Sequence, residues 1–509
     1  MSTPPGPGAG AVRHVDHVIV GAGFAGLCAA IKLQEDGESD FVVLEKGPDV
    51  GGTWRDNTYP GATCDVPSQL YSYSFAPYDW SRSYSPQPEI QDYIKKVAGE
   101  SGTLDRFVFD TPMQDASWDD AAQRWTVRTP NGNWVSKTLV VGAGGLSEPR
   151  MPDIEGIGTF QGQIFHSARW DHGVDLTGKR VAVIGTGASA IQIVPEVAKV
   201  ATHVDVYQRT APWVIPRNDR VYSRAERAAL RRVPGLRRLY RTGLYWGHEA
   251  FVPAFTLQPK LAAPARMQAL RNISKAISDP ELRAKVTPHF MLGCKRVLRS
   301  NDWYPTLAAD HTELVTDPIA KVTGNAIVTA DGTEREIDVL VVATGFYTTE
   351  LPITEHITGR AGQTLADRWR AGGMAAYKGT TVPDFPNLFL LVGPNTGQGH
   401  TSMIFIIESQ VAYVRDALRR LRAEGLASLE PIPEITDSWN KSLQKRMRRT
   451  VWTTGGCQSW YLDSHGRNTT LWPRSTADFR RRLASFDAEA YQETPPTATT
   501  ATAASATAR

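Results

Sequence analysis

Two stretches of the chain share one order of apolar and polar residues: a short apolar run, a glycine-rich turn, a helical apolar period, a second apolar run and a polar residue at its end. The first stretch, residues 17–46, opens with the apolar run Val18–Val20 and closes on Glu45. The second, residues 180–210, closes on Arg209. The pattern predicts two strand–helix–strand units of the Rossmann type.

Glycines stand where the turn of such a unit needs them. The first turn has Gly21, Gly23 and Gly26, and the second has Gly185 and Gly187, with Ala190 in the third position. The first glycine of each turn permits a tight bend, the second lets the backbone approach a pyrophosphate, and the helix N-terminus adds partial positive charge. A lone GxGxxG match is weak evidence. The whole strand–turn–helix–strand order makes both turns candidate dinucleotide sites.

The residue at the end of each unit indicates which dinucleotide binds there. Glu45, 19 residues after Gly26, can accept hydrogen bonds from ribose hydroxyls, as FAD or NAD offers. Arg209 cannot accept, but it can pair with a 2′-phosphate, which favours NADPH over NADH. The alternative for Arg209 is a solvated surface cation.

Apolar runs that end in glycine also occur at 138–149, 337–346 and 387–395, as buried parallel strands do. We therefore predict an α/β fold with two nested Rossmann-like domains and the active site between them. Residues 217–290 are rich in arginine and lack strand-like alternation, which predicts a helical insertion. A solvated basic face over an apolar packing face is the favoured interpretation of this insertion, and an amphipathic helix on a membrane surface is the alternative. The predicted division is a flexible arm (1–14), an FAD-binding domain (15–150 and 346–492), an NADPH-binding domain (151–216 and 291–345), the insertion (217–290) and a disordered tail (493–509).

Composition narrows the class of protein. The net charge of +3 over 509 residues is too small for a dedicated nucleic-acid binder. Four cysteines lie far apart without a CxxC motif, so we expect no disulfide framework, zinc site or dithiol centre, and hence a cytoplasmic protein. No apolar run reaches 18 residues, so we expect no transmembrane segment.

Two dinucleotide sites, one for FAD and one for NADPH, imply hydride transfer from nicotinamide to flavin. A disulfide reductase would need a cysteine pair near the flavin, and the sequence shows none. Oxygen is the remaining electron acceptor.

The segment FQGQIFHSARWD (160–171) resembles the FxGxxxHxxxW(P/D) fingerprint of type I Baeyer–Villiger monooxygenases. GGTWRDNTYPGATCD (51–65) resembles a second signature of that family, and the resemblance continues through 343–346, 376–389 and 457–463. Related N- and S-oxygenating flavin monooxygenases share a similar fingerprint, but Trp170 and Asp171 favour the Baeyer–Villiger branch. Ala190 and Asp384 depart from the family pattern without affecting a cofactor site.

The resemblance implies that a ketone, O₂ and NADPH become an ester or lactone, water and NADP⁺ through a C4a-peroxyflavin. This chemistry needs a fixed cation beside the reacting oxygen. Arg296, in GCKRVLRSNDWY (293–304), aligns with the family's cation, and Asp65 with its carboxylate partner. Without the resemblance, Arg296 would be a surface or phosphate-binding residue and Asp65 a turn residue.

Similarity also assigns the cofactor contacts. Lys295 joins Arg209 and Thr210 at the NADPH phosphate, and Trp460 lies near the nicotinamide ribose. Trp54, Tyr71 and Met403 match flavin-lining positions, and core packing is the alternative for these three residues and for Trp460. His166 and Trp170 are expected to couple domain motion, not to touch substrate. The remaining candidate contacts are Gly52 and Thr53 for FAD and Thr186, Ser189 and Gln192 for NADPH.

Two other functions stay open on the sequence. The same flavin chemistry can oxygenate nitrogen or sulfur, and a catalytically silent FAD-binding protein is a third class.

Overall fold

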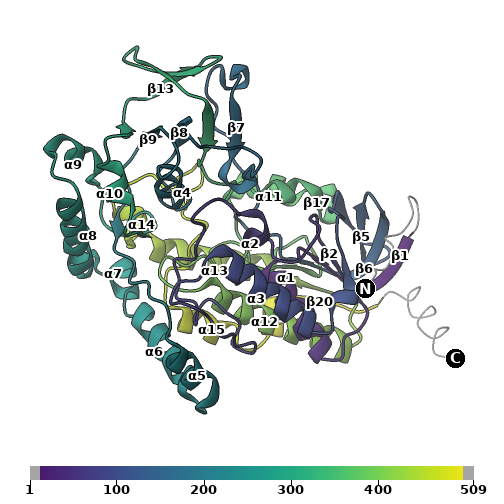
Figure 1. The fold of residues 1–509 in the computed structure, drawn as a ribbon. Helices are drawn as coiled ribbons and strands as arrows, with labels where there is room; N and C mark the ends of the chain where they lie inside the picture. Colours follow the sequence, from purple (N-terminus) through teal and green to yellow (C-terminus); the bar gives the residue numbers. More distant parts are fainter. Residues whose placement is uncertain (1–11, 497–509) are drawn as a thin grey trace.

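The computed structural model describes residues 12–496 and contains two large sheets (Figure 1). The first has eight strands in the order β17-β4-β5-β6-β1-β2-β3, with β18 paired to β6. Its residues come from both ends of the chain. The strands are β1 (Val12–Val20), β2 (Phe41–Leu44), β3 (Phe107–Val108), β4 (Asp115–Asp119), β5 (Arg124–Thr129), β6 (Gly132–Val141), β17 (Ile357–Thr358) and β18 (Leu388–Leu390).

The second sheet has five parallel strands in the order β12-β9-β8-β16-β7, and it is inserted between the two parts of the first. Its apolar runs are buried on both faces, as parallel strands require. The strands are β7 (Gln163–His166), β8 (Arg180–Ile184), β9 (His203–Tyr207), β12 (Thr312–Val315) and β16 (Val339–Val342), and a small antiparallel sheet follows with β13 (Ile319–Val322), β14 (Ala326–Thr329) and β15 (Glu334–Glu336). The predicted α/β fold with two nested Rossmann-like units is confirmed.

Helices cover the sheets and complete each unit. The apolar stripe of α1 packs with the long α12 in one core, and α4 packs in a second core on the inserted sheet. Both α1 and α4 directly follow a glycine-rich turn. The bounds are α1 (Phe24–Glu35), α2 (Thr53–Asp56), α3 (Gln87–Glu100), α4 (Ala190–Val197), α10 (Trp303–Leu307), α11 (Leu365–Gly372), α12 (Met403–Ala423), α13 (Pro433–Met447), α14 (Val451–Thr454) and α15 (Thr476–Arg482).

The predicted insertion is helical. Figure 1 shows its helices along one side of the molecule. The short strands β10 (Val214–Ile215) and β11 (Leu298–Arg299), which precede and follow the insertion in the chain, pair in parallel. The helices are α5 (Arg224–Arg232), α6 (Leu236–Glu249), α7 (Val252–Thr256), α8 (Ala263–Ala276) and α9 (Pro280–Val286).

The chain ends carry more regular structure than the sequence predicts. Strand β1 begins at Val12, inside the predicted arm. At the other end, β20 (Tyr491–Thr494) pairs with β19 (Ser428–Pro431), and its last two residues belong to the predicted tail. Pairing with a neighbouring strand satisfies the backbone of these segments, which composition alone does not reveal. The rest of the arm and tail lies outside the described residues.

The prediction that the cysteines form no disulfide is wrong. Cys294 and Cys457 are disulfide-bonded, with Cα atoms 6.1 Å apart and a sequence separation of 163. The fold brings together two segments that no local motif connects. Cys28 and Cys64 are free and buried.

Candidate functional site

The first glycine turn follows β1 and is shaped by close backbone contacts. Gly21 has φ of +98°, and a Cβ there would lie 2.6 Å from the Gly142 carbonyl oxygen. A Cβ on Gly26 would meet the Gly21 carbonyl oxygen at 1.8 Å. At Gly23 the nearest protein atom would be 3.7 Å away. The outer glycines are thus required by the fold, while the middle one leaves room for a ligand at the N-terminus of α1.

Glu45 ends β2 and closes this turn. Its carboxylate is buried and accepts hydrogen bonds from the backbone N–H groups of Ala22 (2.7 Å) and Gly47 (2.8 Å). Arg55 donates to Glu45 Oε1 at 2.8 Å. The sequence analysis missed Arg55, because nothing in the pattern links α2 to the end of β2.

The flavin-side aromatic candidates lie together. Gly52 precedes α2, which begins at Thr53 and carries Trp54. The Trp54 indole donates to the Tyr71 hydroxyl at 2.9 Å, with the rings edge to face. Met403, the first residue of α12, packs with both against the same core. Burial raises the pKa of Tyr71, so its hydroxyl stays protonated.

The second glycine turn follows β8 and repeats the design of the first. Gly185 has φ of +118°, and a Cβ there would meet the Ala343 carbonyl oxygen at 2.4 Å, whereas nothing lies within 4 Å of a Cβ at Gly187. Thr186 Oγ1 donates to the Thr210 carbonyl oxygen at 3.2 Å, which ties the turn to the end of β9. Ser189 is the N-cap residue of α4, but its side chain makes no capping hydrogen bond.

Gln192, a predicted NADPH contact, makes hydrogen bonds to the 51–65 segment. Its amide donates to the Thr63 carbonyl oxygen at 2.9 Å and accepts from the Tyr59 hydroxyl at 3.1 Å. Gln192 therefore joins α4 to the 51–65 segment of the first sheet. Burial raises the pKa of Tyr59 to about 12, so this donor keeps its proton.

Two cations converge beyond β9. Arg209 and Thr210 are exposed, and Lys295 is half-buried. Burial and the nearby charge of Arg209 lower the pKa of Lys295, which places the two side chains within electrostatic range. Neither cation forms an ion pair with a carboxylate in residues 12–496. An anion would relieve their mutual repulsion.

Arg296 and Asp65 form a two-point ion pair across the two nested units. Arg296 Nε donates to Asp65 Oδ2 at 2.8 Å, and Nη2 donates to Oδ1 at 2.6 Å. Burial would raise the pKa of Asp65, but the charge and hydrogen bonds of Arg296 outweigh burial and lower it. Asp65 in turn raises the pKa of Arg296. Nη1 has no hydrogen-bond partner among the described residues, so this donor is left for another group.

Tyr461 lies within electrostatic range of this pair, and Trp460 precedes it in the chain with its ring against that of Tyr461. Trp460 is 44% exposed, so its alternative as a core residue does not apply, and its carbonyl accepts from Thr348 Oγ1 at 3.2 Å. Tyr461 is buried, which raises its pKa to about 12, while the charge of Arg296 acts in the opposite direction. The sequence analysis missed Tyr461, because only the fold places it near Arg296.

The fingerprint segment lies on and after β7. His166 is buried, which lowers its pKa, and its ring contacts Phe346 at 5.7 Å between centroids. Trp170 packs edge to face on Phe165 at 4.9 Å. This segment pairs with β16 at the edge of the second sheet.

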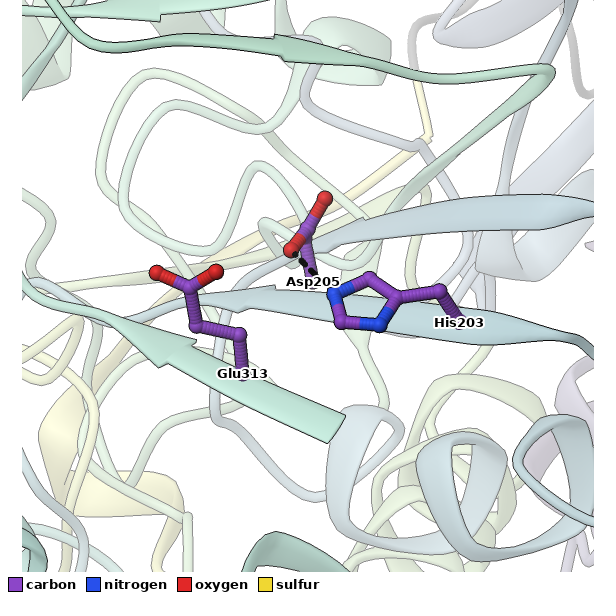
Figure 2. Close-up of side chains that lie close together, drawn as sticks. All are labelled: His203, Asp205 and Glu313. Atoms are coloured by element: carbon purple, nitrogen blue, oxygen red, sulfur yellow. Dashed lines mark hydrogen bonds and ion pairs between the residues drawn. The ribbon is translucent and has the colours of Figure 1, made fainter. Parts of the chain in front are cut away.

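One group of potential metal ligands occurs in residues 12–496, formed by His203, Asp205 and Glu313 on β9 and β12 (Figure 2). His203 Nε2 lies 3.2 Å from Asp205 Oδ1, and Arg335 donates to Glu313. Charges of both signs are therefore already paired here. The group lies on β9 and β12 of the second sheet, whereas Arg296 lies just before β11, which belongs to the separate β10–β11 pair.

Comparisons with known proteins match this geometry. Residues 18–227 match the family model described as pyridine nucleotide-disulphide oxidoreductase. A Baeyer–Villiger monooxygenase of Streptomyces coelicolor is 48% identical over 95% of this chain and 93% of its own length. Another, of Pseudomonas aeruginosa, is 47% identical over 97% of this chain and 94% of its own. A crystal structure of OTEMO in complex with FAD and NADP superposes with a TM-score of 0.86 at 28% identity, covering 94% of this chain and 99% of that one.

Proposed function

The chain belongs to the Baeyer–Villiger monooxygenase family, and we propose the residues with which it converts a ketone, O₂, NADPH and a proton to an ester or lactone, water and NADP⁺. The observation that carries the assignment is the two-point Arg296–Asp65 pair, which joins the two units that each contain a dinucleotide turn.

The residues present fit FAD and NADPH. The open space over Gly23 and Gly187 is what a pyrophosphate needs at each turn. Buried polar atoms of Gln398 and Thr401, just before Met403, have no partner within the described chain, which suits a polar ligand beside α12. Bound FAD, reduced by NADPH, supplies the reaction with O₂.

The chain's own groups orient both nucleotides. Arg209, Thr210 and Lys295 bind the NADPH 2′-phosphate, because a dianion is bound best by several donors of opposite charge. Glu45 accepts from an FAD ribose hydroxyl, and Trp54, Tyr71 and Met403 pack at the flavin. Trp460, exposed and next in sequence to Tyr461, covers the nicotinamide ribose. Gln192 and Tyr59 hold the NADPH-binding unit against the FAD-binding unit.

Arg296 stabilises negative oxygen during the reaction. Its guanidinium stays charged when partly buried, whereas a lysine there could lose its proton. Asp65 holds Nε and Nη2 in a fixed plane and leaves Nη1 to donate to an oxyanion. Preorganised donors of this kind lower the barrier because they need no reorientation as charge develops.

Ketones are the proposed substrate class, and the related N- or S-oxygenation is the competing chemistry. Incubating the enzyme with NADPH, O₂ and a panel of cyclic, linear and aryl ketones should give esters or lactones. Matched amines and thioethers should yield less product per NADPH consumed. Oxygenation of the heteroatom compounds alone would reject the ketone assignment.

A cytoplasmic location rests on the use of NADPH. The cysteine argument for it no longer holds, because Cys294 and Cys457 are joined. No helix in residues 12–496 is long and apolar enough to cross a membrane. We also propose that residues 15–150 and 346–492 form the FAD-binding unit, and that residues 151–216 and 291–345 form the NADPH-binding unit.

A further inference from the structure

The Cys294–Cys457 disulfide joins two segments that carry site residues. Cys294 directly precedes Lys295 and Arg296, and Cys457 lies three residues before Trp460. Cys294 is fully buried, whereas Cys457, inside the loop 455–461, is half-buried. The disulfide therefore limits the distance between the segment that carries Lys295 and Arg296 and the loop that carries Trp460.

The loop 455–461 has few other polar attachments to that segment. The Met291 N–H donates to the Gly455 carbonyl oxygen at 2.9 Å. Beyond this point Gly456, Gln458 and Trp460 are exposed, and only Tyr461 is buried again. Two consecutive glycines give the loop many backbone states when it is not held at its middle.

We propose that Cys294 and Cys457 form a thiol–disulfide switch that positions the Trp460 loop, with hydrogen peroxide as its oxidant and a dithiol as its reductant. The proposal rests on the proposed function, because it takes Lys295 and Trp460 as NADPH contacts. In the disulfide form the loop is held over the nicotinamide side, and NADPH binds well. In the dithiol form the loop samples other states, so ordering it opposes NADPH binding.

Bonds, protons and electrons are accounted for in both the reduction and the oxidation of the cysteine pair. For reduction, a thiolate of the dithiol attacks the half-buried Cys457 sulfur, and Cys294 leaves as a thiolate and takes up a proton. The second thiol of the reductant then displaces Cys457, which also takes up a proton, and the reductant becomes a cyclic disulfide.

For oxidation, the Cys457 thiolate attacks one oxygen of hydrogen peroxide, giving a sulfenic acid and hydroxide, which becomes water. The Cys294 thiolate then attacks that sulfur, and a second water leaves as the disulfide forms. A flavoprotein that reduces O₂ without transferring oxygen releases this oxidant, so the switch would respond to the enzyme's own uncoupled turnover.

The test counts thiols and measures nucleotide affinity on the same FAD-loaded protein. Alkylation under denaturing conditions, read by intact mass, should find two thiols, Cys28 and Cys64, in the peroxide-treated enzyme and four after dithiol treatment. NADP⁺ titration should give a Kd about threefold to tenfold higher in the dithiol form, the cost of ordering a few side chains. The KM for NADPH should rise in parallel while kcat changes little, and peroxide should restore both constants.

Variants separate the switch from general damage. Cys457→Ser should have the weak affinity permanently and should not respond to dithiol or peroxide. Cys28→Ala, which removes a buried thiol on α1, should respond as the wild type does. The wild-type titration needs no substitution, so a misfolded variant cannot leave the question open.

Four alkylated thiols after peroxide treatment would overturn the proposal, and so would a Kd for NADP⁺ that is equal in both forms. Failure of the proposed function would differ from either result. It would appear as the absence of ester from every ketone in both redox forms, whatever the thiol count.

Discussion

Arg209 and Lys295 are cations without a carboxylate partner in the described chain, and Lys295 has a lowered pKa. Arg209→Ala should raise the KM for NADPH about tenfold or more, because a charge-assisted hydrogen bond is worth about 1.5–3 kcal/mol. The KM for NADH should change little, since NADH has no 2′-phosphate. Steady-state assays with both nucleotides measure this, with Lys199→Ala, an exposed cation after α4, as the control. An equal effect on both nucleotides would show that Arg209 does not bind the phosphate.

If Lys295 binds the phosphate as proposed, phosphate binding should depend on pH. Burial and Arg209 lower its pKa, so the lysine loses its proton below 10.5, its ordinary value. The kcat/KM for NADPH, which reports groups of the free enzyme, should therefore fall as pH rises through this alkaline range. Lys295→Arg should flatten the profile, because a guanidinium keeps its charge. A profile that is the same for NADPH and NADH would contradict the assignment.

Within the second glycine turn, Gly185 is required for folding, whereas Gly187 is expected to be required for nucleotide binding. A Cβ at Gly187 has no protein atom within 4 Å, so Gly187→Ala should leave the melting temperature unchanged, and the larger Gly187→Val should raise the KM for NADPH at least about tenfold by occupying the pyrophosphate space. Gly185→Val places a Cβ against the Ala343 carbonyl oxygen at positive φ and should lower the melting temperature. Calorimetry and kinetics on these variants check this. Unchanged NADPH kinetics in Gly187→Val would place the nucleotide elsewhere.

The sequence was sufficient to predict several elements of the fold, because the residues that identify each of them lie within about 30 positions of one another. The turns, the apolar strands and the arginine-rich helices all have this property. The contacts that depend on distant segments were not predictable: Arg55 on Glu45, Tyr461 beside Arg296, and Cys294 bonded to Cys457. The Arg296–Asp65 pair, 231 residues apart, came from family resemblance, and no spacing rule would have found it.

The first sheet depends on both ends of the chain, because β18 pairs with β6 and α12 packs against α1. A ligand bound at this junction should stabilise the whole molecule by mass action. Removing FAD should therefore lower the melting temperature by several degrees, on the order expected for a few kcal/mol, and adding FAD should restore it. Calorimetry of the apoprotein with and without FAD measures the shift. Identical melting temperatures would show that FAD does not bind across the junction.

We propose that the Arg296–Asp65 pair serves oxygen transfer and not cofactor binding. Ester formed per NADPH consumed should be measured for Arg296→Ala, with Arg271→Ala, which removes an exposed cation on α8, as the control. The account predicts that Arg296→Ala retains FAD and NADPH affinity but loses ester formation on the order of a hundredfold. The NADPH still consumed should appear as hydrogen peroxide, and Arg296→Lys should restore only part of the activity. Ester formation by Arg296→Ala at nearly the wild-type rate would contradict the account.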